Sequence, residues 1–354
     1  MARVLVALSG GVDSSAAAAL LLEAGHEVVG ATMKLWGGES DSGCCSVSDV
    51  EDARRVADRL GIDHHVFNFT EEFDRHVVGP YVAAHGAGLT PNPCVECNRH
   101  LKFDAFLARA IRLGFDAVAT GHHARIVGGD GGPRLLRGRD RRKDQSYVLS
   151  CLGRAELERV LLPVGELTKD EVRELAAARG LSTARKPDSQ EVCFIAGGSG
   201  PLARRRFLEP RLDLHPGVVV DAATGAVLGE VPAVELVTVG QRRGLGVAAG
   251  SRRFAVEVDV PGRRVVLGDE SALTEREIHL ERRTWTGAPL EKESEVLVQA
   301  SAHGATTPGV LTAGGVFLFE GRRRVAPGQV VALYDRETAS EVLGSGVASA
   351  RTAA

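Results

Sequence analysis

Three features that would indicate a compartment or a partner are missing from the 354-residue sequence. No apolar run is long enough to cross a membrane, and no basic segment followed by an apolar one opens the chain. The net charge is only −3, so there is no overall basic excess, and any nucleic-acid binding would have to rest on local patches. We therefore expect a cytoplasmic protein with no membrane partner.

What is present is the composition of a globular protein with two or three domains. Hydrophobic residues make up 44% of the chain and charged residues 25%, which leaves ample material for a buried core. There are six cysteines. In a reducing compartment, cysteines are more often catalytic, metal-binding or buried than joined in structural disulfides.

The most informative stretch lies at the start of the chain. An apolar, strand-like run at residues 3–8 ends at Gly10 and Gly11, and residues 16–23 have helical character. Glycines let a backbone approach a ligand closely, and the hydroxyl of Ser14 would lie beside the unpaired amides of a helix N-terminus. This pattern predicts a phosphate site. It lacks the lysine of a Walker A loop and the spacing of a dinucleotide-binding loop, and a plain turn with a capping serine is the alternative.

Strands that alternate with helices predict an α/β domain with a doubly wound, mostly parallel sheet over residues 1–200. We expect strands at residues 3–8, 27–33, 66–69 and 117–119, and helices at residues 46–60, 99–113 and 168–179. Thr168 is the expected N-cap of the last helix, with Glu171 as its capping-box partner. Ligands of such sheets bind at the carboxyl ends of the strands. The predicted phosphate loop and the polar residues 120–123 should therefore face the same crevice.

The second half of the chain consists of short β-rich runs separated by glycine and proline turns. These runs lie at residues 218–220, 234–239, 254–260, 265–267, 295–300, 315–319 and 330–334. We expect a central β-rich domain over residues 201–272 and a closed β-barrel domain over residues 273–354.

Two cysteines are candidate reactive thiols. Cys97 follows Pro91 and Pro93 and should lie near the start of a helix, where the helix dipole would lower its pKa. Cys193 lies in a short apolar, strand-like run. For both residues, an inert buried cysteine is the commoner alternative.

A basic, turn-rich segment at residues 137–147 suits contacts to phosphates with a base nearby. Further basic runs lie at residues 204–206 and 322–324. A solvated surface is the commoner meaning of such runs, so both interpretations remain open.

Six motifs occur in the order seen in the tRNA-specific 2-thiouridylase (MnmA) family, and the resemblance spans almost the whole chain. They are Ser9-Gly10-Gly11-Val12-Asp13-Ser14-Ser15, Thr90-Pro91-Asn92-Pro93 with Cys97-Asn98, Ala119-Thr120-Gly121-His122, Lys143-Asp144-Gln145-Ser146-Tyr147, Asp188-Ser189 with Cys193-Phe194-Ile195, and Gly240-Gln241-Arg242-Arg243-Gly244-Leu245-Gly246. The first resembles the SGGxDS loop of the N-type ATP pyrophosphatases, which split ATP into AMP and pyrophosphate to adenylate an oxygen. The resemblance implies an N-terminal adenine-nucleotide domain followed by two β-rich domains. It also implies an enzyme that replaces the C2 oxygen of the wobble uridine with sulfur in tRNAs for lysine, glutamate and glutamine.

The resemblance further implies roles for individual residues. ATP, accompanied by Mg²⁺, would be bound by Ala7, Leu8, Ser9, Gly10, Gly11, Val12, Asp13, Ser14, Met33 and Gly121. Cys193 would carry a persulfide sulfur received from a partner such as a cysteine desulfurase or a sulfur-relay protein. Cys97 would be the nucleophile that helps to deliver this sulfur and then closes a disulfide with Cys193. The tRNA would be contacted by Asn92, Pro93, Cys94, His122, Lys143, Asp144, Gln145 and Gln329.

The chain departs from the family pattern at two places. Cys94 occupies a position that is Asp in part of the family, and with Cys97 and Cys193 it makes the ligand set of a [4Fe-4S] cluster with one open iron. Cluster-dependent thiolation is therefore an alternative, and we favour the persulfide route because a Cys-x-x-Cys pair also serves redox chemistry. Ser301 and Ala302 stand where relatives often have an Arg-Tyr pair that contacts tRNA. Binding by the last domain is expected to be weaker or differently arranged.

Two other classes of protein remain open. Another adenylating ligase or amidotransferase with the same loop would not need Cys97 and Cys193. A non-catalytic tRNA-binding protein would show no tRNA-dependent release of pyrophosphate, and it would not need Ser9 or Asp13.

Overall fold

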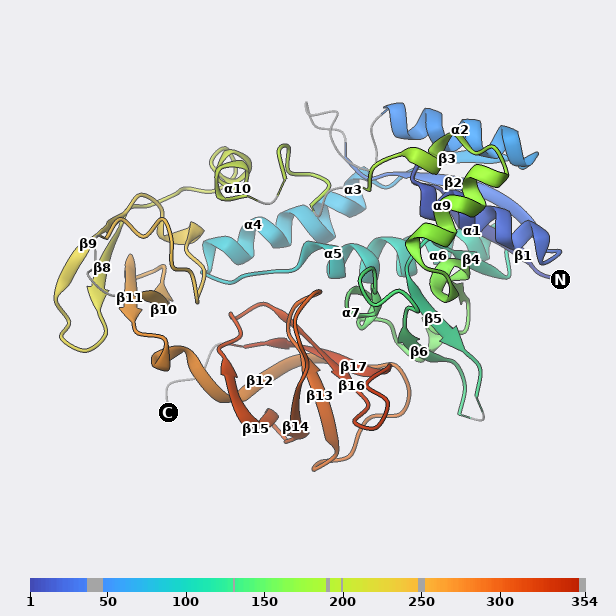
Figure 1. Cartoon of the computed structure of the whole chain (residues 1–354). Coiled ribbons are helices and arrows are strands. Elements are labelled where there is room, and N and C mark those ends of the chain that lie inside the picture. Colours follow the sequence, from blue (N-terminus) through green and yellow to red (C-terminus); the bar gives the residue numbers. More distant parts are fainter. Residues whose placement is uncertain (37–46, 130, 189–191, 199, 248–251, 350–354) are drawn as a thin grey trace.

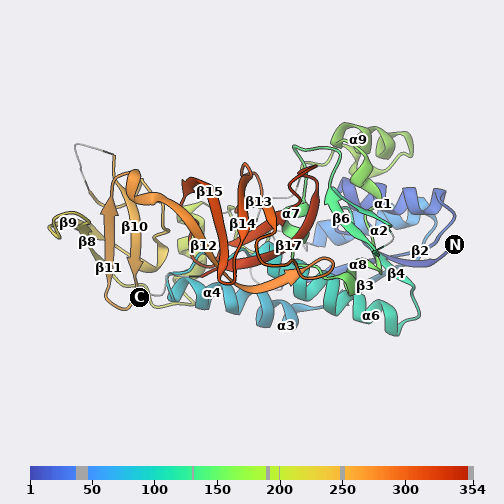
Figure 2. The same cartoon turned by 90° about the horizontal axis from the view of Figure 1, so that it is seen from below.

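The computed structural model describes residues 1–36, 47–129, 131–188, 192–198, 200–247 and 252–349. Its strands form three sheets: a parallel sheet, a four-stranded sheet and a sheet that closes into a barrel (Figure 1). The four-stranded sheet, the barrel and the parallel sheet follow one another along the molecule (Figure 2). No helix within these described residues is long and apolar enough to cross a membrane.

The N-terminal region is built on a five-stranded parallel sheet with the order β3-β2-β1-β4-β7. Its strands are β1 (Arg3–Ala7), β2 (Glu27–Lys34), β3 (His64–Asn68), β4 (Ala117–Ala119) and β7 (Val160–Leu161). The longer helices of this region are α1 (Val12–Glu23), α2 (Val47–Leu60), α4 (Gly79–Gly86), α6 (Phe106–Arg112) and α9 (Lys169–Ala178). Its short helical segments are α3 (Thr70–Phe73), η1 (Asp74–Val78), α5 (Pro93–Glu96), η2 (Cys97–Ala105), α7 (Ser146–Leu149), α8 (Arg154–Leu157), η3 (Pro163–Glu166) and η4 (Ser182–Arg185).

Both faces of the parallel sheet are buried, as the continuous apolar run of β1 predicts. Leu5 and Ala7 pack into one hydrophobic cluster with Phe106 of α6. Val4 and Val6 point to the other face and pack in a second cluster, which includes residues of α1 and α2. The predicted α/β class is therefore confirmed, and the four predicted strands of this region are all present.

The helix that carries Cys97 begins earlier than the sequence indicated. Asn92 caps it, because its side-chain oxygen accepts hydrogen bonds from the amides of Cys94 (3.2 Å) and Val95 (3.3 Å). Pro93 takes the first helical position, where a missing amide hydrogen costs nothing. The predicted start at residue 99 was wrong, since the cap and the proline lie further upstream.

The middle region contains a helix and a small mixed sheet with the order β10-β11-β8-β9. Its elements are α10 (Pro201–Leu208), β8 (Gly217–Asp221), β9 (Val227–Val231), η5 (Val234–Leu236), β10 (Phe254–Asp259) and β11 (Arg264–Gly268). The strand predicted at residues 234–239 was wrong, because the chain turns there as a 3₁₀-helix. The buried carboxylate of Glu235 holds this turn by accepting hydrogen bonds from the amide and ring of His215.

The last region is a closed six-stranded barrel, which confirms the predicted barrel. After η6 (Ser271–Leu273) its strands are β12 (Thr274–Trp285), β13 (Glu295–Gln299), β14 (Thr307–Leu311), β15 (Gly315–Arg323), β16 (Val330–Tyr334) and β17 (Glu341–Ala348). The order β12-β15-β14-β13-β16-β17 closes through pairing of β12 with β17. Val296, Val298, Leu318 and Val331 are among the fully buried residues of its core.

A hairpin of the N-terminal region is joined to the barrel. Strands β5 (Ala124–Val127) and β6 (Arg134–Arg137) extend the barrel sheet, with Leu135 and Leu136 opposite the start of β17. At this junction, Arg137 forms an ion pair of 2.7 Å with Asp144 and donates a hydrogen bond of 2.6 Å to Gln299. The first and last regions therefore share a buried polar contact.

Arg137→Met is expected to lower the free energy of unfolding by about 3 kcal/mol, because it leaves Asp144 as a buried carboxylate without its cation. Arg134→Met is the matched control. Arg134 pairs with Glu341 across the same junction, but its side chain is 51% exposed, and surface pairs contribute about 0–1 kcal/mol. Urea unfolding followed by circular dichroism measures both losses. Equal losses in the two variants would contradict a special role of the buried pair.

Candidate active site

The loop between β1 and α1, which the sequence predicts to bind phosphate, lies at the carboxyl edge of the parallel sheet. Gly10 has a φ of +70°, and a Cβ atom added there would lie 2.3 Å from the backbone oxygen of Asp49. Gly11 begins α1 without a side-chain cap, so the positive helix N-terminus remains available to an anion. The backbone geometry therefore requires glycine at position 10, whereas a Cβ atom at Gly11 would make only an ordinary contact of 3.5 Å with Ser9 Oγ.

Serine hydroxyls hold this loop in shape. Ser14 Oγ accepts a hydrogen bond from the amide of Ser9 (3.2 Å) and donates one to the carbonyl of Gly11 (3.0 Å). Ser15 Oγ also donates to the Gly11 carbonyl, and it accepts a hydrogen bond from Thr183. The loop is preorganised by the same serines that the sequence motif contains.

The loop after β4 lies directly against the first turn of α1. A Cβ atom at Gly121 would lie 2.5 Å from the backbone carbon of Asp13 and 2.5 Å from the backbone nitrogen of Ser14. Strands β1 and β4 are neighbours in the sheet. From β1 the chain continues to β2 on one side, and from β4 it continues to β7 on the other side. Ligands of parallel sheets bind at such a switch point. The two predicted loops therefore lie side by side at the edge of the sheet where the sequence predicts a ligand crevice.

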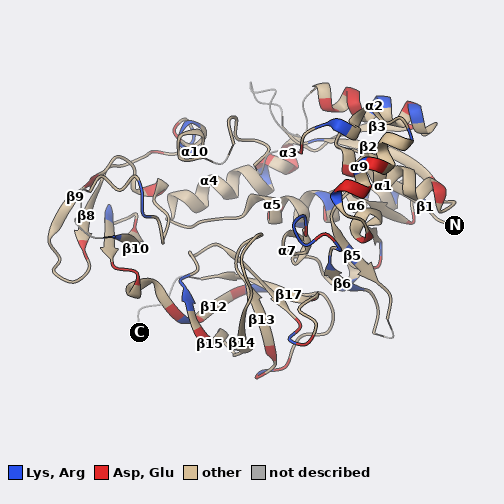
Figure 3. Cartoon of the chain, in the orientation of Figure 1, with Lys and Arg blue, Asp and Glu red and all other residues tan. Residues whose placement is uncertain are grey.

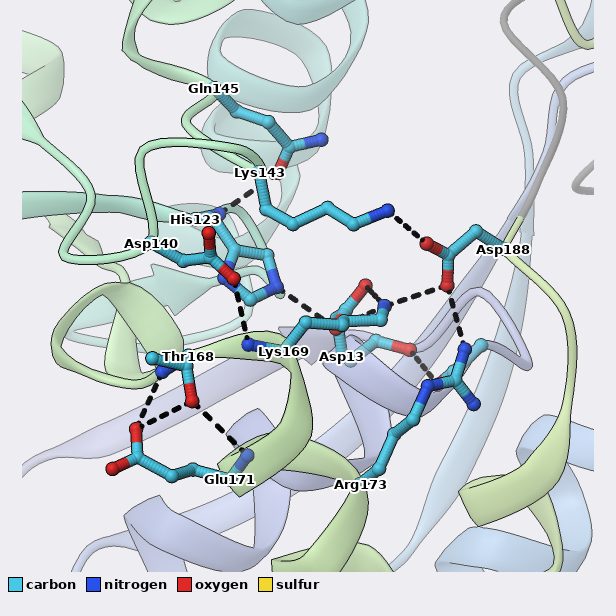
Figure 4. A network of polar contacts seen from close by, with 12 residues as sticks. Asp13, His123, Asp140, Lys143, Gln145, Thr168, Lys169, Glu171, Arg173 and Asp188 are labelled. Atoms are coloured by element: carbon cyan, nitrogen blue, oxygen red, sulfur yellow. Dashed lines mark hydrogen bonds and ion pairs between the residues drawn. The ribbon is translucent and has the colours of Figure 1, made fainter.

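A network of charged side chains lines this crevice (Figure 4). Lys169, the first residue of α9, contacts Asp13 at 2.7 Å, and His123 Nε2 lies 3.1 Å from the same carboxylate. Burial acts to raise the pKa of Asp13, but the hydrogen bonds with His123 and Lys169 outweigh it and lower this pKa below its usual value. Asp13 is therefore charged at neutral pH.

A second carboxylate, Asp188, completes the network. It pairs with Lys143 (2.7 Å), Lys169 (2.8 Å) and Arg173 (3.0 Å). Partial burial acts to raise its pKa, but hydrogen bonds from Lys143 and Lys169 lower the pKa of Asp188 to about 2. Three segments that are distant in sequence thus meet beside the phosphate loop.

The two candidate thiols belong to one hydrophobic cluster. Cys97 is buried at the first position of the π-helical segment η2, and π-helical turns frequently mark functional sites. Cys193 is half-buried and packs against the cluster that contains Cys97. The same cluster includes Ala7 and Met33, two residues expected to line the nucleotide site.

Cys193 lies in a turn, so the strand-like run predicted there was wrong. The reason is the next residue, because Phe194 packs its ring against aromatic side chains of other elements instead of along a sheet. Its ring neighbours are Trp36, Phe73, Tyr81 and Phe207, at centroid distances of 5.1–6.3 Å. This aromatic group anchors the segment that carries Cys193.

Part of the predicted tRNA site lies where the barrel meets the N-terminal region. Gln329 donates a hydrogen bond of 3.1 Å to the carbonyl of Thr90, just ahead of Asn92 and Pro93. A cleft of about 360 Å³ opens beside this contact. Its lining includes Asn92, Pro93, Glu96, His100, Arg282 and Gly328. Cys94 is half-buried in the same short helix, α5.

The other residues predicted to contact tRNA make internal contacts. His122 is buried between Thr120 (2.7 Å) and Lys102 (3.3 Å), and burial lowers its pKa well below the ordinary value. Gln145 accepts a hydrogen bond of 2.9 Å from the amide of His123. Asp144 and Lys143 form the ion pairs described above, so these side chains organise the crevice in this structure. Their contact with tRNA stays a prediction.

No group of three or more His, Cys, Asp or Glu side chains within the described residues is placed to hold a metal ion. Cys94, Cys97 and Cys193 are therefore not brought together as a cluster site here. The sequence also did not single out Lys169 or Arg173, because a lysine and an arginine in the first turns of an amphipathic helix look like surface residues. The only signal was their place just after the predicted N-cap Thr168, which is confirmed as a capping box with Glu171.

A parallel sheet with a glycine–serine loop at its switch point, followed by two β-rich regions, defines an ATP-utilising enzyme of the PP-loop class. Three families match in succession: "tRNA methyl transferase HUP domain" at residues 2–197, "tRNA methyl transferase PRC-barrel domain" at residues 205–269 and "Aminomethyltransferase beta-barrel domain" at residues 275–348. The tRNA-specific 2-thiouridylase MnmA of Roseiflexus sp. (strain RS-1) is 44% identical over 375 residues, covering 98% of this chain and 99% of that protein. The protein of the same name from Chloroflexus aggregans is 47% identical over 357 residues, covering 98% of each. The chain belongs to the tRNA-specific 2-thiouridylase MnmA family.

Some solved structures show a distant likeness to the chain. The U34-tRNA thiolase NcsA from Methanococcus maripaludis, solved with its [4Fe-4S] cluster, is 16% identical with a TM-score of 0.36. The match covers 59% of this chain and 64% of that one. A likeness this low does not bear on the choice between a persulfide and a cluster.

Proposed function

We propose that this chain is a tRNA-uridine 2-sulfurtransferase. It adenylates the C2 oxygen of uridine 34 with ATP and replaces that oxygen with sulfur from a cysteine persulfide, giving 2-thiouridine, AMP and pyrophosphate. The observation that carries the proposal is a chain-long match to 2-thiouridylases combined with two thiols, Cys97 and Cys193, in the hydrophobic cluster that reaches the phosphate loop. We further propose residues 1–200 as the catalytic domain, 201–272 as the central domain and 273–354 as the barrel domain.

The nucleotide would lie across the carboxyl edge of the parallel sheet. We assign its binding to the loop of residues 7–14, with Met33 at the end of β2 and Gly121 after β4 as further lining residues. The contacts that support this assignment are the uncapped N-terminus of α1 and the close approach of Gly121 to it. Mg²⁺ would neutralise charge on the phosphates, and the carboxylate of Asp13 is a suitable oxygen ligand beside them.

The transfer of the persulfide sulfur to uridine requires only two thiols of the protein, Cys193 and Cys97. The terminal sulfur of a Cys193 persulfide attacks C2, AMP leaves with the former uridine oxygen, and the uridine is then linked to Cys193 through a disulfide. The Cys97 thiolate attacks the Sγ atom of Cys193, so that 2-thiouridine leaves and a Cys97–Cys193 disulfide forms. A cellular thiol reductant must then restore both thiols.

The tRNA would lie against the N-terminal region and the barrel. We assign Asn92, Pro93 and Cys94 to the target base and Gln329 to the adjoining tRNA. Asn92 and Pro93 line the cleft, Cys94 follows them in α5, and Gln329 contacts Thr90 just ahead of them. Basic segments on α10 and at the end of β15 lie on neighbouring regions and suit contacts to phosphates (Figure 3). Ser301 and Ala302 add no cation on the barrel. We expect tRNAs for lysine, glutamate and glutamine as substrates, and a cysteine desulfurase or sulfur-relay protein as donor.

The proposal is tested with the purified full chain, unmodified tRNA, ATP and a persulfide donor. Mass spectrometry of the digested tRNA is expected to show 2-thiouridine, with about one pyrophosphate released per sulfur transferred. Pyrophosphate release that needs no tRNA would instead favour another adenylating ligase or amidotransferase. No release at all would favour a non-catalytic tRNA-binding protein.

Iron analysis after anaerobic purification decides between the two sulfur routes. The persulfide route predicts iron at background level and full activity with the persulfide donor alone. Stoichiometric iron together with a requirement for sulfide would establish the [4Fe-4S] alternative through Cys94, Cys97 and Cys193.

A further inference from the structure

Three cations of the crevice converge on a single carboxylate (Figure 4). Lys143 comes from the turn before α7, while Lys169 and Arg173 are one turn apart on α9. Their nitrogens lie 2.7, 2.8 and 3.0 Å from the oxygens of Asp188. The two oxygens of a carboxylate accept up to about four hydrogen bonds, so Asp188 can hold all three cations on one small anion.

The same cations border the phosphate loop. Lys169 bridges Asp188 and Asp13, and Asp13 lies in the first turn of α1 at the uncapped helix N-terminus. The Lys169 side chain is only 11% exposed, so its charge acts in a partly desolvated place. The loop itself contains no lysine that could reach the phosphates, and α9 supplies one from outside the loop.

The charges of this group do not cancel. Asp188 carries one negative charge against the three cations that contact it, and Asp13 pairs with only one of them, Lys169. A polyphosphate offers several charged oxygens at the spacing that crowded lysine and arginine donors prefer. The group is therefore better matched to a polyphosphate than to the single carboxylate that it holds.

We propose that these three cations form the subsite for the pyrophosphate end of ATP, and that Asp188 occupies this subsite as an internal anion when no nucleotide is bound. The inference rests on the proposed function and deepens it, because it assigns Lys143, Lys169 and Arg173 to the leaving group. Binding of ATP then exchanges the Asp188 carboxylate for phosphate oxygens.

The proposal predicts opposite effects on pyrophosphate binding for two variants. If Asp188 were a scaffold residue, both variants would weaken this binding. Removing the competing charge in Asp188→Asn is expected to tighten the binding of pyrophosphate about tenfold. Removing a donor in Lys169→Ala is expected to weaken it about tenfold or more. The matched controls are Asp213→Asn and Lys292→Ala, which change the same charges at exposed positions far along the chain and should leave the affinity unchanged.

Isothermal titration calorimetry of the full chain with pyrophosphate, in buffer with a metal chelator, measures these affinities without any sulfur chemistry. Unchanged or weaker binding by Asp188→Asn would overturn the proposal and make Asp188 a metal ligand or a scaffold residue. Asp188→Ala, checked by circular dichroism, repeats the test, and loss of folding in both variants would equally overturn it. If the wild-type chain binds neither pyrophosphate nor ATP, the proposed function itself fails.

Discussion

In a Cys193→Ser variant, the formation of 2-thiouridine is expected to fall by about 10³-fold or more, while ATP binding stays at the wild-type level. Serine cannot hold a sulfane sulfur, so no persulfide can form at this position. Cys193 is not among the residues assigned to the nucleotide, so tRNA-dependent release of pyrophosphate should continue. Mass spectrometry of tRNA digests and calorimetry with ATP measure the two quantities separately.

Cys97→Ser is expected to abolish turnover at a later step than Cys193→Ser, so the two variants can be distinguished by the species that accumulates. When Cys193 is loaded with persulfide, the terminal sulfur can still attack the adenylated uridine, but the thiol assigned to release the product is missing. A covalent adduct of tRNA and protein should therefore accumulate and disappear on addition of dithiothreitol. Full activity of either variant would refute the assignment of the two thiols.

Cys151→Ser is the matched control for both variants. Its thiol is buried and donates weak hydrogen bonds to the carbonyls of Val95 and Val148. Burial raises the pKa of Cys151 to about 12, so this thiol stays protonated and is a poor nucleophile. Activity of Cys151→Ser is expected near the wild-type level, and a loss as large as that of Cys193→Ser would indicate a general effect on folding.

Sequence patterns predicted those parts of the fold that depend on local periodicity. The continuous apolar run of β1 and the capping box at Thr168 are confirmed, because each is determined by neighbouring residues. The strand predicted at residues 234–239 failed because a buried contact between Glu235 and His215 overrides the β-propensity of its valines. Strand β14 contains Pro308, a residue that normally argues against a strand.

In the site, too, the features set by neighbouring residues were predicted and those set by residues far apart in the sequence were not. The phosphate loop was predicted from one contiguous motif, whereas the ion pair between Lys169 and Asp13 joins residues 156 positions apart. The hydrophobic periodicity of the sequence does not indicate such a pair. The family resemblance implied that His122 contacts tRNA, yet its ring is buried against Lys102. Only the packing of the loops shows which polar residues are used internally.

Gly121→Ala is expected to lower tRNA-dependent release of pyrophosphate about 100-fold, because displacing catalytic groups by about 1 Å has effects of this size. The added methyl group would lie 2.5 Å from backbone atoms of Asp13 and Ser14, and neither backbone can rotate away as a side chain would. The loop after β4 or the first turn of α1 must therefore shift. Overpacking of this kind is also expected to destabilise the fold by about 1–3 kcal/mol.

Gly128→Ala is the control for this variant, because no atom lies within 4 Å of a Cβ atom at that position in the same region of the chain. Its activity and melting temperature should stay near the wild-type values. ATP affinity, measured by calorimetry, separates the two consequences in Gly121→Ala. A shifted α1 weakens ATP binding, whereas unfolding lowers only the fraction of protein that binds. Wild-type affinity and wild-type pyrophosphate release in Gly121→Ala would show that the contact between the two loops does not shape the nucleotide site.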